Sequence, residues 1–429
     1  MVWAIIAGGF FLTALIGVPI GIGLALIGMT ILHVVVGDAT DLAINAVWNV
    51  FNEFTLSAVP LFIFMGEILL VSGVSGRMYS AIAPLFMKVP GKLLHTNIAV
   101  SAVFGAVSGT STSTAAAIGS VAYPELEKRG YEPATVVGTL AAGGTLGLLI
   151  PPSLALLIFG ATQQVSIGQL FLAGLLPGIM LALMMMAYVW LVISRREGVV
   201  PEDAKWIGWW RSFLTLLPIW PVGFLIFSVL GTIYMGLATP TEAAGLGVLA
   251  SVILGFLWGD LTFRSLWKAF NDSVQVFVTI GVVILGALIL AQAISILGLP
   301  LQVLTWIESM NMGPIAVLAA VSVFYLVLGC FFDGISLMLM TLPIVFPVMT
   351  GVGFDPVWLG VVVTILIEVG MLTPPVGMNL YILSGITGNR VTLMQAAHAS
   401  FPYWLLLLLG VVILTIFPAI ALFLPNLVY

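Results

Sequence analysis

Four clusters of polar and helix-breaking residues interrupt the apolar stretches of this sequence. Two of them are Pro-Pro pairs, Pro151-Pro152 in GLLIPPSL and Pro374-Pro375 in GMLTPPVG. Proline has no N–H donor and disfavours helix at the residue before it, so backbone carbonyls near each pair lack partners. The flanking residues are Gly147, Ile150 and Ser153 for the first pair, and Gly370, Thr373 and Val376 for the second. Free carbonyl and hydroxyl oxygens suit Na⁺.

The other two clusters carry hydroxyl and acidic side chains. VSGTSTST supplies Ser108, Gly109, Thr110, Ser111, Thr112, Ser113 and Thr114, and CFFDGIS supplies Asp333, Gly334 and Ser336. We expect each cluster to form a hairpin tip that faces one Pro-Pro break, because irregular backbone at membrane depth must line a cavity or be covered by protein. This predicts two cation sites, while half-helix N-termini would attract an anion. Close helix packing explains Ser113 and Thr114 at least as well.

Two acidic residues lie deep within apolar sequence. Asp333 belongs to the second tip, and Glu368 lies one turn before the second Pro-Pro pair. An ionisable side chain at membrane depth is a functional candidate by default, although Glu368 is also open to a packing or hydrogen-bonding role. Glu67 and Glu242 lie nearer predicted helix ends, where interfacial, capping or subunit-contact roles remain open.

The composition excludes water as the solvent for this chain. Of its 429 residues, 61% are hydrophobic and 7% are charged, whereas soluble domains carry about 25% charged residues. The mean hydropathy is +1.24, and apolar runs long enough to cross about 30 Å of hydrocarbon recur along the whole length. No basic stripe is available for nucleic acid, and the single cysteine, Cys330, permits neither an internal disulfide nor a cysteine-based metal cluster. We expect a multi-pass protein of the lipid bilayer.

The second half of the chain repeats signatures of the first half in order. WNVFNE, which begins at Trp48, matches WKAFND, which begins at Trp267, and GYEP at Gly130 matches GFDP at Gly353. Each EP or DP motif is followed at the same spacing by a Pro-Pro pair. The offset drifts only from 219 to 225 residues, so duplication is a better explanation than chance similarity in apolar sequence.

Lysine and arginine accumulate in short cytoplasmic loops, and the two halves place them differently. First-half loops contain Lys88, Lys92, Lys128, Arg129, Arg195 and Arg196, and their second-half counterparts contain none. Conversely, Arg264, Lys268 and Arg390 lie in second-half loops whose first-half partners lack positive charge. The halves therefore face in opposite directions. We expect a cytoplasmic N-terminus and a periplasmic C-terminus.

These signals predict an all-α integral membrane protein built from two inverted repeats. The first repeat covers 1–195, with a re-entrant hairpin at 95–123 and a broken helix at 135–161. A cytoplasmic linker and a connecting helix without a first-half partner cover 196–235. The second repeat covers 236–429, with a hairpin at 314–349 and a broken helix at 358–385. Spans are expected at 3–36, 58–75, 135–161, 166–194, 213–234, 236–258, 274–297, 358–385 and 397–424. Many secondary transporters share this architecture and bind substrate and ions near the midplane of the bilayer.

Three segments of the sequence carry a resemblance to a known family: VSGTSTSTAAAIGSVAYPELEKRGYEPATVVGTLAAGGTLGLLIPPS, FDGISLMLMTLPIVFPV and GMLTPPVGMNLYILSGI. They resemble the DctM-like large membrane subunit of tripartite ATP-independent periplasmic (TRAP) transporters. The resemblance runs across essentially all 429 residues. It implies an elevator of the ion transporter superfamily type in the bacterial or archaeal inner membrane. It also implies Na⁺-coupled uptake of an organic anion, of the carboxylate or sulfonate class. A periplasmic binding protein would deliver the anion, and a small four-helix membrane subunit, expected here as a separate chain, would assist.

The resemblance also assigns the predicted sites. Sodium site 1 would comprise Ser108, Gly109, Thr110, Ser111, Thr112, Gly147, Ile150 and Ser153. Sodium site 2 would comprise Asp333, Gly334, Ser336, Gly370, Thr373 and Val376. The anion would contact Ser111, Pro152, Ser153, Pro375, Gly377 and Asn379. No cofactor is expected beyond Na⁺ as the coupling ion.

Two other functions remain open. A stand-alone Na⁺/divalent-anion symporter of similar design would work without a binding protein. A membrane-embedded enzyme or an assembly scaffold is a weaker alternative, because the sequence lacks G-x-x-x-x-G-K-[ST] and H-E-x-x-H motifs and its three histidines, His33, His95 and His398, are scattered.

Overall fold

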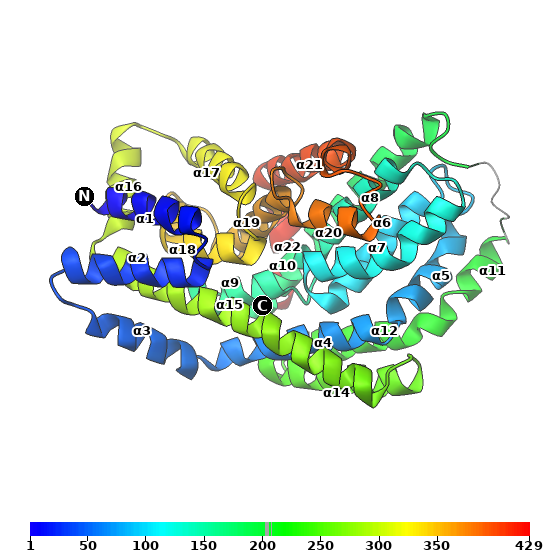
Figure 1. Cartoon of the computed structure of the whole chain (residues 1–429), viewed down its shortest axis with the longest axis horizontal. Coiled ribbons are helices and arrows are strands. Elements are labelled where there is room, and N and C mark those ends of the chain that lie inside the picture. Colours follow the sequence, from blue (N-terminus) through cyan, green and yellow to red (C-terminus); the bar gives the residue numbers. More distant parts are fainter. Residues whose placement is uncertain (202–205, 207) are drawn as a thin grey trace.

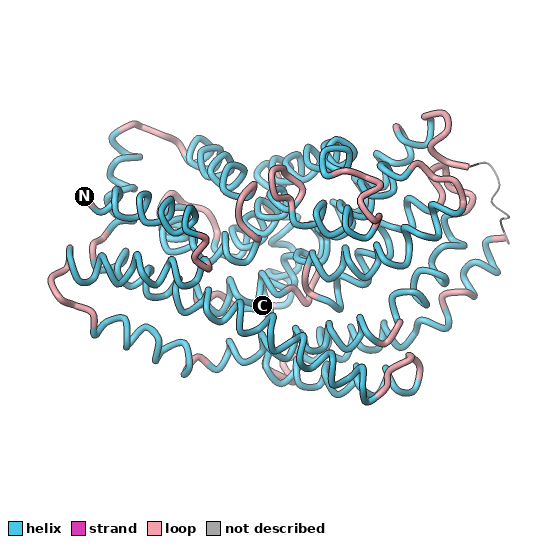
Figure 2. Tube along the Cα trace, viewed as in Figure 1, coloured by secondary structure: helices cyan, strands magenta, loops and turns pink. Residues whose placement is uncertain are grey.

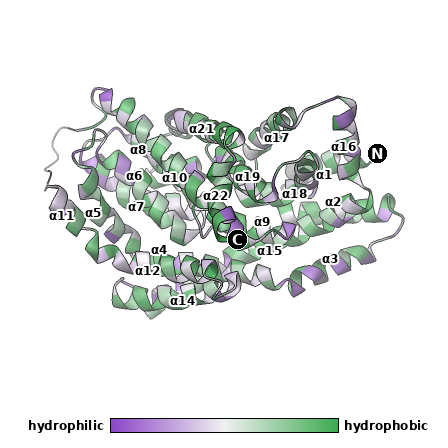
Figure 3. Cartoon of the chain, turned by 180° about the vertical axis from the view of Figure 1, so that it is seen from behind, coloured by the Kyte–Doolittle hydropathy of each residue, from purple (hydrophilic) through white to green (hydrophobic). Residues whose placement is uncertain are grey.

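The computed structural model describes residues 1–201, 206 and 208–429, and these residues form helices and loops without a strand (Figure 2). Residues 202–205 and 207, in the predicted cytoplasmic linker, lie outside the described part. Eight helical stretches within the described residues are long and apolar enough to cross a membrane. Many large apolar side chains are exposed, among them Leu183, Leu249 and Leu257, and most helices are coloured as hydrophobic in Figure 3, as expected where lipid rather than water is the solvent.

Two helical hairpins of matching dimensions occupy equivalent positions in the two halves. The first consists of α6 (Leu93–Ser108) and α7 (Ser111–Lys128), and the second of α17 (Pro314–Gly329) and α18 (Gly334–Gly351). Each hairpin has a first arm of 16 residues and a second arm of 18 residues. In Figure 1 the two hairpins approach the middle of the molecule from opposite ends.

A broken helix follows each hairpin. In the first half α8 (Pro133–Leu149) stops before the Pro-Pro pair and α9 (Leu154–Gln163) continues after it; in the second half the two parts are α19 (Pro356–Met371) and α20 (Met378–Ile386). Both Pro-Pro peptide bonds are cis. Glu132 and Asp355 precede α8 and α19, and a proline occupies the first turn of each helix, where its missing N–H costs nothing.

The first apolar run forms two helices, so the prediction of one span over 3–36 is wrong. The helices are α1 (Val2–Ile16) and α2 (Ile20–Val34), and Gly17, with φ of +74°, turns the chain between them. They run antiparallel, because a Cβ built on Gly9 would lie 2.6 Å from Ile27 Cγ1 and one on Gly23 would lie 3.1 Å from Thr13 Oγ1. The N-terminus therefore lies at the same end as the end of α2. The single span predicted over 3–36 would have put the N-terminus and the end of α2 on opposite sides of the membrane.

The sequence predicted a helix over 213–234 with no counterpart in the first half of the chain, but the structure shows a counterpart. This region contains α11 (Trp209–Leu214), α12 (Trp220–Ile226), a π-helical turn at Phe227–Gly231 and α13 (Thr232–Tyr234), and it doubles back into α14 (Pro240–Leu257). Val229 lies against Gly247, and these residues follow Gly9 and Ile27 by 220 positions each. The pair α12–α14 is thus the counterpart of α1–α2. The second repeat begins before residue 236, contrary to the predicted boundary.

The remaining helices frame the hairpins and broken helices. They are α3 (Asp41–Asn52), α4 (Ala58–Val71), α5 (Val74–Phe86), α10 (Ile167–Leu191), α15 (Phe263–Ile296), α16 (Leu299–Ser309), α21 (Leu393–Ile416) and α22 (Ala419–Val428). Helices α4 and α15 end close to the ends of the predicted spans 58–75 and 274–297, and each is followed by a further helix that the sequence did not predict. The predicted span 397–424 is divided by the boundary between α21 and α22. Helix α2 packs along α15, and its counterpart α14 packs along α4.

Loops predicted for the cytoplasmic side contact one another. These contacts join Lys92 to the Pro201 carbonyl, the Glu132 amide to the Val199 carbonyl, Arg390 to Glu127 and Arg77 to Asp260. A separate pocket gathers residues from loops predicted for the outer side, among them Glu53, Gln164, Gly236 and Tyr429. The two groups of loops are therefore spatially distinct.

Glycine pairs set the distance between each hairpin and its broken helix. A Cβ at Gly105 of α6 would lie 2.6 Å from the Cα of Gly147 in α8, and a Cβ at Gly370 of α19 would lie 2.6 Å from the Cα of Gly329 in α17. Real Cβ atoms cannot approach backbone so closely. Any side chain at these positions would push the hairpin arm away.

We expect Gly370→Ala to lower the free energy of unfolding by about 1–3 kcal/mol, because overpacking displaces backbone. Gly245→Ala in α14 is the matched control, since nothing lies within 4 Å of its built Cβ. Thermal unfolding of the purified protein, monitored by size-exclusion chromatography, measures the difference. Equal midpoints for the two variants would contradict the close backbone contact.

Candidate functional site

The first hairpin tip is fixed to the first Pro-Pro break. Gly109 ends α6 and its carbonyl accepts a hydrogen bond from the amide of Leu154, the first residue of α9, at 3.0 Å. Thr110 caps α7, because its hydroxyl accepts a hydrogen bond from the Ser113 amide at 3.3 Å. The tip therefore satisfies its own helix end and also satisfies an amide of the broken helix.

The second tip repeats this arrangement with different side chains. The Cys330 carbonyl accepts a hydrogen bond from the amide of Val376, just beyond the Pro-Pro pair, at 3.2 Å. Asp333 caps α18, because its carboxylate accepts a hydrogen bond from the Ser336 amide at 3.0 Å. An acid thus stands where the first tip has Thr110. The residues predicted for each cation site are brought together, one tip against one break.

At the first hairpin tip and its Pro-Pro break, side-chain hydroxyls already form hydrogen bonds within the protein and are buried. The Ser153 hydroxyl donates to the Leu148 carbonyl and accepts from the Leu156 amide, while the hydroxyls of Ser108 and Thr114 lie 2.6 Å apart. Ser108, Gly109, Ser111, Gly147, Ile150, Pro152 and Ser153 are buried, and Thr110 and Thr112 are half-buried. This side of the molecule is closed in the structure.

The second pair is more open. Pro375 and Val376 are exposed, the latter at 37%, and Asp333 and Thr373 are half-buried. Asp333 Oδ2 accepts the Ser336 amide, and the Thr373 hydroxyl donates to the Val369 carbonyl at 2.6 Å. Gly334, Ser336, Gly370 and Gly377 are buried behind them.

A buried polar cluster joins the two repeats through one hydroxyl. Ser111, the first residue of α7, donates to Glu368 Oε2 at 2.9 Å and accepts from Asn379 Nδ2 at 2.7 Å. Asn379 Nδ2 also donates to the Ala141 carbonyl at 3.3 Å. All three side chains are at most 1% exposed. Glu368 Oε1 and Asn379 Oδ1 have no hydrogen-bond partner within the described residues.

Sequence reasoning identified two members of this cluster and left the third open. Ser111 and Asn379 were predicted to contact the anion, and the structure places them in contact with each other but buried. Glu368 was kept between a functional and a hydrogen-bonding role. Its depth in apolar sequence was a signal, but only the fold shows that its partner is Ser111, 257 residues earlier in the chain.

The oxygen atoms at the second break are of the kind that suits a hard monovalent cation. An anion would have to be bound here without a positively charged side chain. Carboxylate, hydroxyl and carbonyl oxygens surround the second break, and within the described residues no group of three His, Cys, Asp or Glu side chains could hold a transition metal. Neither tip and neither Pro-Pro segment contains a lysine or an arginine. The nearest candidate, Arg390, is paired with Glu127 at 2.6 Å. An anion here would be bound by amide and hydroxyl donors.

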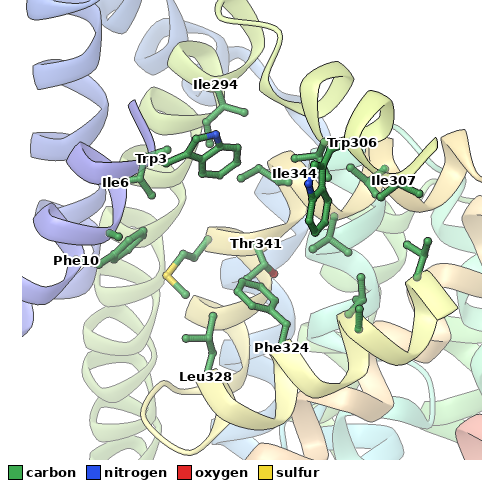
Figure 4. A pocket seen from close by; sticks show the side chains of 18 of the residues that line it. Trp3, Ile6, Phe10, Ile294, Trp306, Ile307, Phe324, Leu328, Thr341 and Ile344 are labelled. Atoms are coloured by element: carbon green, nitrogen blue, oxygen red, sulfur yellow. The ribbon is translucent and has the colours of Figure 1, made fainter. Parts of the chain in front are cut away.

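A separate cavity of about 560 Å³ lies between α1, α15, α16 and the second hairpin (Figure 4). Trp3, Trp306 and Phe324 line it, and Thr341 contributes a lining hydroxyl. The Thr341 hydroxyl already bonds to Tyr325 at 2.6 Å and to the Leu337 carbonyl. Besides this hydroxyl, the two indole N–H groups are the polar side-chain groups of an otherwise apolar lining, and no charged side chain of the described residues lines the cavity.

Comparison with known proteins agrees with this architecture. The family model described as "Tripartite ATP-independent periplasmic transporter, DctM component" matches residues 7–420. The C4-dicarboxylate TRAP transporter large permease protein DctM of Rhodobacter capsulatus is 32% identical over 99% of this chain and 98% of its own. The ectoine/5-hydroxyectoine large permease protein UehC of Ruegeria pomeroyi is 32% identical over 87% of both chains.

A longer relative and a solved structure extend the comparison. The isethionate TRAP transporter permease protein DctMQ of Oleidesulfovibrio alaskensis is 29% identical over 98% of this chain and 66% of its own. The YdaH transporter of Alcanivorax borkumensis, whose crystal structure has an unusual topology, aligns with a TM-score of 0.64 at 14% identity, over 91% of this chain and 88% of its own. That likeness concerns the fold alone. The chain belongs to the TRAP transporter family, as a DctM-type large permease subunit and thus a multi-pass protein of the inner membrane.

Proposed function

We propose that this permease couples the uptake of an organic anion, a carboxylate or a sulfonate, to the entry of Na⁺. The observation that carries the proposal is the docking of each hairpin tip on one Pro-Pro break through a backbone hydrogen bond. Such paired irregular segments are where transporters of inverted-repeat design bind ions and substrate. The relatives named for C4-dicarboxylate and isethionate support an anion, while the one named for ectoine widens the range of substrates.

Alternating access would follow an elevator motion. The hairpins and broken helices, held together by glycine contacts and by the Ser111 cluster, form a unit suited to moving as one body. The paired scaffold helices α2 with α15 and α14 with α4 would stay fixed. A periplasmic binding protein would deliver the anion. The greater length and the name of the relative DctMQ support a small membrane subunit as the second partner.

We also propose a periplasmic position for both termini, in place of the cytoplasmic N-terminus predicted from sequence. The antiparallel α1 and α2 return the chain to the end at which it began. Trp3 of α1 and Met312, in a loop without basic residues, line the same cavity. The basic loops, which the charge rule places in the cytoplasm, contact one another elsewhere.

Cysteine labelling of intact cells tests this orientation. In a Cys330→Ser background, which removes the single cysteine, Val2→Cys should react with a membrane-impermeant thiol reagent. Lys128→Cys, at the exposed C-terminal end of α7, should react only after the cells are opened. The reverse pattern would restore the cytoplasmic N-terminus.

Transport in proteoliposomes tests the proposed function itself. The vesicles would contain this chain with its small partner, and purified binding protein with labelled anions would be added outside, with or without an inward Na⁺ gradient. Asp333→Ala and Thr373→Ala should each reduce Na⁺-dependent uptake by about 10- to 100-fold while still inserting, because each removes a polar cation contact. Glu308→Ala, an exposed acid at the end of α16, is the control. Wild-type rates in both site variants would remove the second ion site, and uptake without binding protein would indicate the stand-alone symporter.

The buried cluster generates a prediction about stability. Ser111→Ala leaves Glu368 Oε2 without its donor and removes one acceptor of Asn379 Nδ2, so the free energy of unfolding should fall by about 1–3 kcal/mol. Ser113→Ala in the same tip is the control, because Ser113 bonds to the Thr110 hydroxyl through its backbone amide, which the substitution keeps. Thermal unfolding in detergent compares the two. A Ser111→Ala midpoint equal to that of the control would show that the cluster contributes nothing to stability.

A further inference from the structure

The hydroxyl of Thr373 has two protein partners at the second Pro-Pro break. It donates its single proton to the Val369 carbonyl at 2.6 Å and accepts the indole N–H of Trp404 at 2.9 Å. A threonine hydroxyl has one donor and two acceptor lone pairs. One lone pair therefore remains, and this is the acceptor capacity that a cation would use.

Trp404 approaches from α21, a helix outside the hairpins and breaks. Its ring stacks on Phe401, one turn earlier, with centroids 5.6 Å apart and planes inclined by 16°. This stacking fixes the direction of the indole N–H. The N–H of Trp404 and the Val369 carbonyl together hold the Thr373 hydroxyl between α21 and the end of α19.

The first repeat lacks this contact. Ile150 precedes the first Pro-Pro pair as Thr373 precedes the second, and Ile179 stands at the position equivalent to Trp404 when Pro177 and Pro402 are aligned. Neither isoleucine has a polar side chain, and Ile179 is 45% exposed. Among the described residues, the equivalent positions of the first repeat therefore cannot form a counterpart of the Trp404–Thr373 hydrogen bond.

We propose that Trp404 is a positioning residue for the second cation site, which it serves by fixing the orientation of the Thr373 hydroxyl. The proposal rests on the proposed function, since it requires Na⁺ to bind at Thr373 and Asp333. Trp404 itself would not contact the ion. Its removal would weaken Na⁺ binding without eliminating it.

The test measures Na⁺ binding through stability, so it requires no knowledge of the transported anion. The purified full-length chain in nanodiscs is unfolded thermally in NaCl and KCl mixtures of constant ionic strength, because a ligand that binds only the folded state raises the midpoint. Trp404→Phe keeps the ring and its stacking but removes the N–H. We expect the Na⁺ concentration for half-maximal stabilisation to rise about 3- to 10-fold, the effect of one lost hydrogen bond.

Trp358→Phe is the matched control. Its indole N–H also joins α19 to α21, by donating to the Leu414 carbonyl at 2.9 Å, far from the break in sequence. It should lower the midpoint in both salts and leave the Na⁺ dependence unchanged. A double-mutant cycle adds Thr373→Val, in which Trp404→Phe should have no further effect on Na⁺ dependence.

The outcomes separate this inference from the proposed function. If the wild type shows no Na⁺-specific stabilisation, the Na⁺ coupling fails and the role of Trp404 fails with it. If the wild type responds but Trp404→Phe retains its Na⁺ dependence, or shifts it no more than Trp358→Phe does, only the inference is wrong. If Trp404→Phe does not fold, the Na⁺ dependence of Thr373→Val, with Trp404 intact, is measured instead. An unchanged Na⁺ dependence in that variant also overturns the proposal, because the proposal requires the Thr373 hydroxyl to bind Na⁺.

Discussion

Backbone polar groups in hydrocarbon have no water to bond to, and this constraint organises the centre of the protein. Each unpaired group costs several kcal/mol, so irregular backbone must find protein partners. The two hairpin tips and the two Pro-Pro breaks solve the problem together: the Gly109 carbonyl takes the Leu154 amide, and the Cys330 carbonyl takes the Val376 amide. Glycine pairs allow the necessary approach. Each docked pair thus brings one tip and one break together while satisfying backbone groups of both.

The two docked pairs share a backbone geometry but differ in chemistry. The first is neutral, hydroxyl-rich and buried, while the second has Asp333 at its tip and exposes Pro375 and Val376. An acid beside an open break attracts a cation more strongly than hydroxyls do, and it is easier to reach. The difference gives the two sites different accessibility in this conformation, although duplication made their frames alike.

Much of this could be predicted from the sequence, because the strongest signals were local. Pro-Pro pairs, the polar tips and the basic loops are all visible in short segments, and the structure has helix ends at both tips and at both Pro-Pro pairs. The helix boundary at Gly17 was missed, because a long apolar run gives no periodic signal to separate one helix from two. That error also hid the pairing of α1 with α2 and thus the counterpart of α12.

Contacts between distant segments were beyond sequence reasoning. Ser111, Glu368 and Asn379 meet only because the two repeats pack against each other, and no local pattern pairs residues 257 or 268 positions apart. The same is true of Trp404 and Thr373, since an aromatic residue in an apolar helix is usually a packing residue. Asn379 and Ser111 were identified from their motifs, but their burial depends on the assembled fold.

The Ser111 cluster also bears on the symmetry of the chain. At the offset of the Pro-Pro pairs its three members have unlike counterparts in the other repeat: Gly334 for Ser111, Thr145 for Glu368 and Leu156 for Asn379. Two identical copies in opposite orientations could not hold one such bridge without forming a second across their symmetry axis. A single, off-axis bridge therefore requires that the two halves differ in sequence. The first half supplies the hydroxyl of this bridge and the second supplies its carboxylate and amide, so neither half could take the place of the other.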